Sequence, residues 1–232
     1  MHDGASFGVD VNAREPRLGI DALMLSAELG LELAIPRLHE LGANLNGRTR
    51  VAGMTASYAA AASNHAGCLK ALHSAGADLA LPQRDGATPL AVACQQNCPA
   101  AVSILTELGC PSSDKAACGG GGMHANVSGN APRNDGMYPI HIAAWAGSVE
   151  CIRVLGEACP GSCATITPDL DTPLHLASWR GHATAVRALL SLPGGSHRSI
   201  VNSVNVLRTG ECPPGGAGAS DDGKVKRWGQ ST

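Results

Sequence analysis

The sequence predicts an all-α solenoid of stacked helix-turn-helix units, and three observations carry this prediction. Glycine-containing loop ends recur at Gly8, Gly42, Gly76 and Gly109, at steps of 34, 34 and 33 residues. A second register, a set of equivalent positions at the expected helix starts, recurs at steps of 34, 33, 50 and 34 residues. The step of 50 residues is a normal step plus an insertion. Aromatic residues make up only 3% of the chain, and Ala, Leu and Gly are abundant, which favours thin layers of small side chains. A fixed period of this length is the signature of a repeat protein.

The residue types of the second register explain why helices begin there. Thr and Asp side chains cap the free backbone N–H groups of a first turn, and proline fits the first helical position, as Pro89 and Pro173 do here. We therefore expect inner helices to start at these five positions: Asp21, Thr55, Thr88, Tyr138 and Thr172. About ten residues later comes a residue that tolerates a left-handed conformation and ends a helix. These breaks are Gly30, Asn64, Asn97, Gly147 and Gly181.

A second amphipathic run follows each break, so each unit should contain two short antiparallel helices. In "HATAVRALLSL" the apolar residues Ala185, Val186, Leu189 and Leu190 have helical spacing. The segments "DGATPLAVACQQN", "NDGMYPIHIAAWAG" and "DLDTPLHLASWRGH" together resemble the ankyrin repeat. The resemblance implies five repeats, at about 15–46, 47–80, 81–109, 134–163 and 164–193, with an insertion at 110–133.

The resemblance also implies structural roles for signature residues. It assigns such roles to Thr88, Pro89, His141, Thr172, Pro173 and His175. In the family the histidine ties the hairpin loops of neighbouring repeats together. The first three repeats have Met24, Tyr58 and Ala91 at this position. We therefore expect the first three repeats to be held less rigidly than the last two.

Both ends of the predicted array depart from the period. Residues 1–14 fit the end of an upstream repeat whose two helices would precede Met1, which suggests a truncated gene model or a domain boundary. Residues 194–210 contain apolar positions that could cap the last helix pair. Residues 211–232 are rich in Gly, Pro and Ser, and we expect them to be disordered. The insertion is Gly- and Ser-rich, which indicates a flexible loop, with an extension of the binding surface as the alternative.

Composition excludes several function classes. The net charge is −2, so no basic field exists to attract nucleic acid or an acidic membrane. No run of 18 apolar residues and no signal-peptide pattern are present in the sequence, which predicts an intracellular protein without membrane association. Whether it is cytoplasmic or nuclear stays open. Nine irregularly spaced cysteines are then expected to be free thiols.

Two of the three tryptophans, Trp145 and Trp179, occupy matching positions 34 residues apart. In the ankyrin repeat that the sequence resembles, this position lies near the end of each inner helix, beside a concave surface that binds partners. The tryptophans should stand side by side, about one repeat spacing of ~10 Å apart. The alternative is that both are packing residues only. The predicted partner-binding set is Trp145, Trp179, Arg180, Met137, Asp135, Asp169, Asp171, Asn134, Gln95, Gln96 and Arg84.

The sequence gives little support for a catalytic or metal-binding site. No nucleophile or carboxylate recurs with His141 and His175 at a spacing that catalysis needs. We expect Cys68, Cys94 and Cys151 to be buried small hydrophobes. The pairs Cys94/Cys98 and Cys159/Cys163 lack the second pair of a closed zinc site, and Cys110, Cys118 and His124 form a slightly better candidate. We therefore expect no catalytic residue, no metal and no cofactor.

The sequence thus predicts a monomeric, non-catalytic scaffold or adaptor that binds a protein or peptide on its concave face. A second hypothesis is a regulatory fragment of a longer enzyme or channel. A third is a small redox- or zinc-responsive protein.

Overall fold

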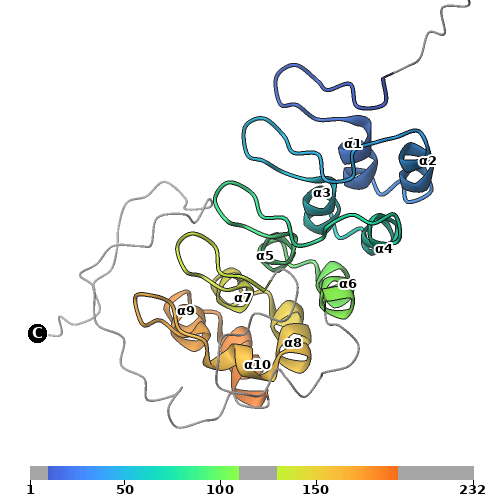
Figure 1. Ribbon diagram of the computed structural model, residues 1–232. Coiled ribbons are helices and arrows are strands. Elements are labelled where there is room, and N and C mark those ends of the chain that lie inside the picture. The colour runs from blue at the N-terminus through green and yellow to red at the C-terminus, as the bar shows by residue number, and fades with distance from the viewer. Residues whose placement is uncertain (1–9, 110–129, 193–232) are drawn as a thin grey trace, which may run out of the picture.

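The computed structural model describes residues 10–109 and 130–192, which fold into five consecutive helical hairpins (Figure 1). The predictions for residues 1–9, the larger part of the insertion and the segments 194–210 and 211–232 lie outside the described residues. The hairpins are α1 (Ala22–Glu28) with α2 (Ala34–Glu40), α3 (Ala56–Ala62) with α4 (Ala66–Ser74), α5 (Pro89–Gln95) with α6 (Pro99–Gly109), α7 (Pro139–Ala146) with α8 (Val149–Ala158), and α9 (Pro173–Trp179) with α10 (Ala183–Ser191). A short 3-10 helix, η2 (Pro160–Ala164), follows α8.

The hairpins stack in chain order into an elongated array. The inner helices α1, α3, α5, α7 and α9 form one row, and each contacts the next. The outer helices form a second row beside it, and extended loops project from the side of the inner helices (Figure 1). No strand occurs in the described segments. The predicted all-α solenoid is therefore confirmed.

The inner helices begin where the sequence places them. Asp21 Oδ1 accepts the backbone N–H of Met24 at 2.9 Å, and Thr88 Oγ1 accepts that of Ala91 at 3.2 Å. Thr55 and Thr172 cap α3 and α9 in the same way. Helix α7 begins after Tyr138 without a side-chain cap. These caps satisfy donors that a short helix would otherwise leave without partners.

The inner helices also end as predicted. Gly30, Asn64, Asn97, Gly147 and Gly181 all have φ between 56° and 77°. Asn64 does more than terminate its helix, because its Oδ1 accepts the backbone N–H of Ala101 in the next repeat at 3.0 Å. Asparagine at this position therefore turns the chain and joins two repeats.

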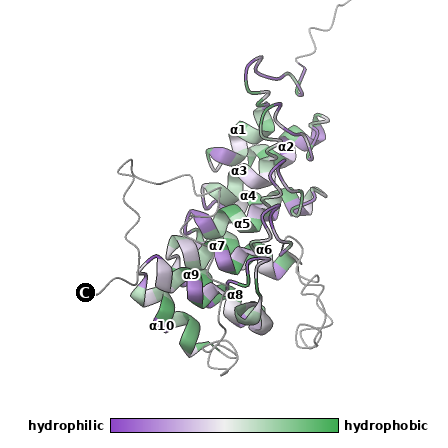
Figure 2. Ribbon diagram, turned by 90° about the vertical axis from the view of Figure 1, so that its left-hand side faces the viewer, coloured by the Kyte–Doolittle hydropathy of each residue, from purple (hydrophilic) through white to green (hydrophobic). Residues whose placement is uncertain are grey.

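The core lies between the two rows of helices and is built from small and aliphatic side chains. The outer helices insert leucines at one repeated position, Leu72, Leu105, Leu155 and Leu189, and all four are buried. Cys68, Cys94 and Cys151 are buried as predicted. In Figure 2 the helices carry apolar stretches, whereas hydrophilic stretches are prominent in the loops. Each repeat thus relies on its neighbours to cover its apolar faces.

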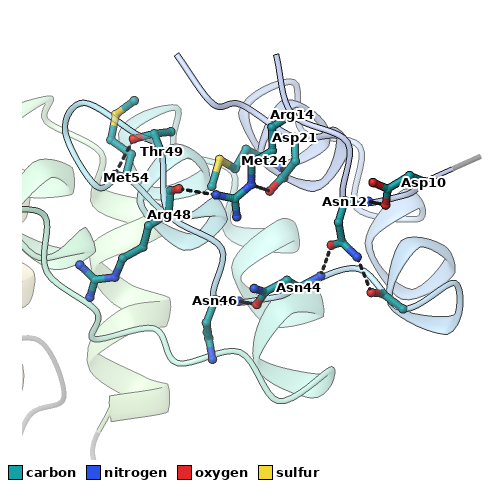
Figure 3. Close-up of polar contacts among 11 residues, drawn as sticks. Asp10, Asn12, Arg14, Asp21, Met24, Asn44, Asn46, Arg48, Thr49 and Met54 are labelled. Carbon is teal, nitrogen blue, oxygen red and sulfur yellow. Dashed lines mark hydrogen bonds and ion pairs between the residues drawn. The ribbon is translucent and has the colours of Figure 1, made fainter. Parts of the chain in front are cut away.

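The loops of the first three repeats are tied by a ladder of asparagine and arginine side chains. Asn12 Oδ1 accepts the N–H of Asn44 at 2.8 Å (Figure 3). Asn46 Oδ1 accepts the N–H of Asp78 at 2.9 Å. Arg14 donates to the carbonyl oxygen of Arg48 at 2.9 Å, and Arg48 donates to the next loop at 2.8 Å. Although these repeats lack the signature histidine, their loops have other side-chain connections. Whether they are less rigid stays a prediction.

Candidate partner-binding site on the inner helices

Trp145 and Trp179 occupy the ends of the neighbouring inner helices α7 and α9. Their ring centroids are 5.7 Å apart, and the ring planes meet at 80°, in an edge-to-face pair. The rings are thus closer than the expected repeat spacing of ~10 Å, because they turn toward each other. Edge-to-face aromatic pairs contribute about 0.5–1.5 kcal/mol beyond area burial.

Arg180, the residue after Trp179, completes the cluster. The centre of its guanidinium group lies 4.6 Å from the centroid of the Trp145 ring, within cation–π range. Trp179 and Arg180 are exposed, whereas Trp145 is half-buried beneath them. Trp179 presents 49% of its surface to solvent. We call Trp145, Trp179 and Arg180 the aromatic patch.

The aromatic patch rests on a small apolar cluster. Trp145 packs against four buried residues from three successive repeats: Ala91, Met137, Ile142 and Leu176. Met137 is only 8% exposed, so the prediction that it lies on the binding surface is wrong. Met137 follows a turn in which the carboxylate of Asp135 accepts the backbone N–H of Met137 at 3.1 Å. A flexible methionine side chain then fills the space beside small residues such as Ala91.

The predicted acidic residues around the patch differ in their surroundings. Asp169 is exposed, whereas Asp135 and Asp171 are half-buried. Asp135 is paired with Arg133, whose Nε donates to it at 3.0 Å. Burial alone would raise the pKa of Asp135, but hydrogen bonds from Arg133 and from the Met137 N–H hold it below its ordinary value. The charge of Asp135 is therefore largely compensated inside its own loop.

Four further predicted residues precede the patch along the chain. Gln95 occupies the position of Trp145 one repeat earlier, and Gln96 follows it at the end of α5; both are exposed. Arg84 is exposed on the loop before α5. Asn134 is also exposed, but its Nδ2 donates to the carbonyl oxygen of Arg84 at 3.1 Å. Asn134 thus joins two loops.

His141 lies in the interior and connects two repeats. Its Nδ1 accepts the N–H of Tyr138, and its Nε2 lies 3.2 Å from the carbonyl oxygens of Thr165 and Asp171. Burial lowers the pKa of His141 to about 4. The contacts with the two carbonyl oxygens raise the pKa, but by less than burial lowers it. The ring is therefore neutral at neutral pH. His175 makes the local contact to the Thr172 N–H at 3.2 Å and is half-buried.

Arg133 is a site residue that sequence reasoning missed. It occupies the loop position of Gln83 in the preceding repeat, and nothing in one sequence marks it as the partner of Asp135. In residues 10–109 and 130–192, no group of three or more His, Cys, Asp and Glu could hold a metal ion. The alternative ligands Cys110, Cys118 and His124 lie outside those ranges. None of the helices found there is long and apolar enough to cross a membrane.

Comparison with known proteins agrees with the geometry. A family model described as ankyrin repeats, in three copies, matches residues 23–116 and again residues 116–199. The tyrosine-protein kinase HTK16 of Hydra vulgaris is 30% identical over 112 residues, which are 48% of this chain and 13% of the kinase. The chain thus spans a small part of that relative. Because the family model covers most of its length, this chain belongs to the ankyrin repeat family.

Proposed function

We propose that this chain is a non-catalytic interaction module that binds a protein or peptide segment across the ends of its inner helices. Ankyrin repeats are in general protein-interaction modules, but a fold alone does not locate a binding site. The observation that carries the proposal is the aromatic patch, with the exposed face of Trp179 at its centre. Aromatic residues and arginine are enriched at the energetic centres of protein interfaces.

The size of the exposed surface suits the patch to an anchoring role. A tryptophan buries about 150–250 Å² when fully covered, so the exposed half of Trp179 offers roughly 100 Å². At about 25 cal/mol per Å², covering that area with an apolar partner side chain contributes about 2.5 kcal/mol. The ring is already held by Trp145, so little side-chain entropy is lost on binding.

Polar residues in the loops and at the ends of the inner helices supply further groups for a partner. The loops before α7 and α9 carry the polar residues Asn134, Asp135, Asp169 and Asp171. Earlier repeats carry Gln95, Gln96 and Arg84. We propose that these groups bind the main chain and polar side chains of the partner. Specificity then comes from residues that differ between repeats, on a scaffold that stays the same.

Selection of peptides on the purified chain tests this proposal. A random peptide library is displayed and selected, and the affinity of the selected peptides is measured by fluorescence anisotropy. We expect Trp179→Ala and Arg180→Ala to weaken binding by about tenfold or more, which corresponds to ~1.4 kcal/mol. Leu190→Gln is the matched control and should bind like the wild type, because Leu190 is exposed on the outer helix α10, whereas the patch lies at the ends of inner helices. Equal binding by all four proteins would refute the proposed site.

The second candidate function is a regulatory ankyrin segment of a larger enzyme. The similarity to 13% of a tyrosine-protein kinase favours it. An antibody against this chain, used on extracts of the source cells, measures the mass of the native protein. A band far above 23.5 kDa supports the larger protein, and a single band at 23.5 kDa contradicts it.

A further inference from the structure

Four exposed leucines lie in the first repeat. Its helix α1 stands at one end of the row of inner helices (Figure 1). Leu25 lies on α1, Leu29 follows it, and Leu31 and Leu33 lie in the turn that leads to α2. Their exposed fractions are 49%, 61%, 52% and 81% in that order. We call them the leucine face. Soluble monomers rarely expose contiguous apolar patches of more than a few hundred Å².

The position of Leu25 is buried in the last three repeats. Its equivalents Val92, Ile142 and Leu176 are between 2% and 5% exposed. Ile142 and Leu176 belong to the cluster that also contains Ala91, from the third repeat. A residue at this position is thus covered in part by the preceding repeat. Leu25 has no such cover among the described residues.

The position of Leu31 shows the same rule through specific contacts. Cys98 Sγ donates to the carbonyl oxygen of Ala62 at 3.5 Å, and His182 Nε2 donates to that of Trp145 at 3.1 Å. In both pairs the acceptor lies in the last turn of the inner helix of the preceding repeat. The ring of His65 likewise lies against Gly30. Leu31 is exposed because the described residues contain no inner helix before α1 that could cover it.

The other two leucines replace polar or small residues. Later repeats have Ser63, Gln96, Ala146 and Arg180 at the position of Leu29, and Gly67, Ala100, Glu150 and Thr184 at that of Leu33. A repeat that ends an array needs an outer face more polar than that of internal repeats. The first repeat here has a face that is more apolar.

The loop before α1 indicates what covers this face. Asn12 bonds to the backbone of Asn44 (Figure 3). Asn46 bonds to the backbone of Asp78 in the same way, one repeat later. The loops at Asn44 and Asp78 each follow an outer helix, α2 and α4. Residues 10–14 therefore occupy the place of a loop that closes a repeat.

We propose that the leucine face is covered by the helical hairpin of a further ankyrin-type repeat, which ends directly in the loop at residues 10–14. The stacking already seen between neighbouring hairpins would then continue past α1. The two helices of the first hairpin extend over residues 22–40, so a second such pair needs more sequence than the nine residues before Asp10. The hairpin would be encoded upstream of Met1 in the same reading frame.

Mapping the 5′ end of the native transcript is the first half of the test. We expect in-frame codons for a helical pair immediately upstream of Met1. The extended protein and the 232-residue chain are then produced, each with and without Leu25→Gln and Leu33→Gln together. We expect the double substitution to lower the Tm of the extended protein by about 5 °C or more and to leave that of the shorter chain nearly unchanged. Val51→Gln is the matched control, because Val51 is exposed and apolar but lies outside the leucine face.

Three results would overturn the proposal. An in-frame stop codon directly upstream of Met1 would remove the hairpin. An unchanged Tm of the extended protein after the double substitution would show that its added residues do not cover the leucines. A concentration-dependent dimer of the 232-residue chain, detected by sedimentation and abolished by the double substitution, would assign the face to a second copy instead.

Discussion

His182 Nε2 donates to the carbonyl oxygen of Trp145 across 3.1 Å, and this bond joins the last two repeats at the base of the aromatic patch. The carbonyl belongs to the last turn of α7, where the helix leaves such groups without an intrahelical partner. The imidazole also lies against Gly147, the residue that ends the inner helix. His182 thus approaches the end of α7 at a place where a Cβ on residue 147 would clash with its ring.

The pair Gly147→Ala and Gly181→Ala separates this close approach from backbone strain. Both glycines have φ of 74°, so either alanine incurs a similar strain of about 1 kcal/mol. A Cβ at Gly147 would come within 2.8 Å of the His182 ring, whereas a Cβ at Gly181 meets nothing within 4 Å. We expect Gly147→Ala to lower the free energy of unfolding by at least ~1 kcal/mol more than Gly181→Ala, as measured in urea. Equal losses would show that the ring moves without cost.

His141 should make stability depend on pH. Its pKa is about 4 in the folded protein, against an ordinary value of 6.5, because burial disfavours the charged ring. Between pH 6.5 and 4 the unfolded chain binds a proton that the folded chain does not. The stabilisation is thus fully present above pH 6.5 and is lost as the pH falls toward 4, by at most ~3 kcal/mol. The difference in unfolding free energy between wild type and His141→Gln should shrink from pH 7.5 to pH 5, and a constant difference would contradict the assignment.

The asparagine ladder predicts a local effect of Asn46→Ala. The substitution removes the acceptor for the Asp78 N–H, and a hydrogen bond of this kind has a net contribution of about 1 kcal/mol. We expect faster hydrogen exchange at Asp78 and a loss of stability of that order. Gln96→Ala, which changes an exposed amide at the end of the inner helix α5, should alter neither. Unchanged protection of the Asp78 amide in Asn46→Ala would mean that the ladder contributes nothing.

The buried cysteines should resist alkylation. Burial raises the pKa of Cys151 to about 12 and that of Cys94 well above its ordinary value, and the reactive species is the thiolate. All six cysteines in the described residues are buried. Iodoacetamide at mildly alkaline pH, followed by peptide mass mapping, should label these six only after unfolding. Rapid labelling of Cys94 or Cys151 in the native protein would contradict this prediction and would favour the hypothesis of a redox-responsive protein.

The sequence alone could predict features that depend on local backbone chemistry. Thr88 before Pro89 marks a helix start because capping and the fixed φ of proline act within one turn. Asn97 marks a helix end because it accepts a left-handed conformation. The adjacency of Trp145 and Trp179 followed from the period, since equal steps place equal positions side by side.

Features that depend on side-chain direction could not be predicted in this way. The repeat pattern places Met137 in a loop where exposure is expected. Its side chain instead turns inward and packs in the cluster that contains the small residue Ala91. The pairing of Arg133 with Asp135 and the reach of Asn12 to the next loop are contacts specific to this chain. A repeat register fixes where a residue is placed, and the surrounding side chains decide what it contacts.

Fluorescence of the aromatic patch tests the proposed function most directly. Trp228→Phe removes the third tryptophan, which lies outside the described residues, so emission reports on Trp145 and Trp179 only. The free protein should show red-shifted emission that acrylamide quenches readily. Addition of a selected peptide should shift the emission to the blue and reduce quenching, and Trp179→Ala should abolish that change. Peptide binding that leaves both the emission and its quenching unaltered would contradict the claim that the aromatic patch is the binding site.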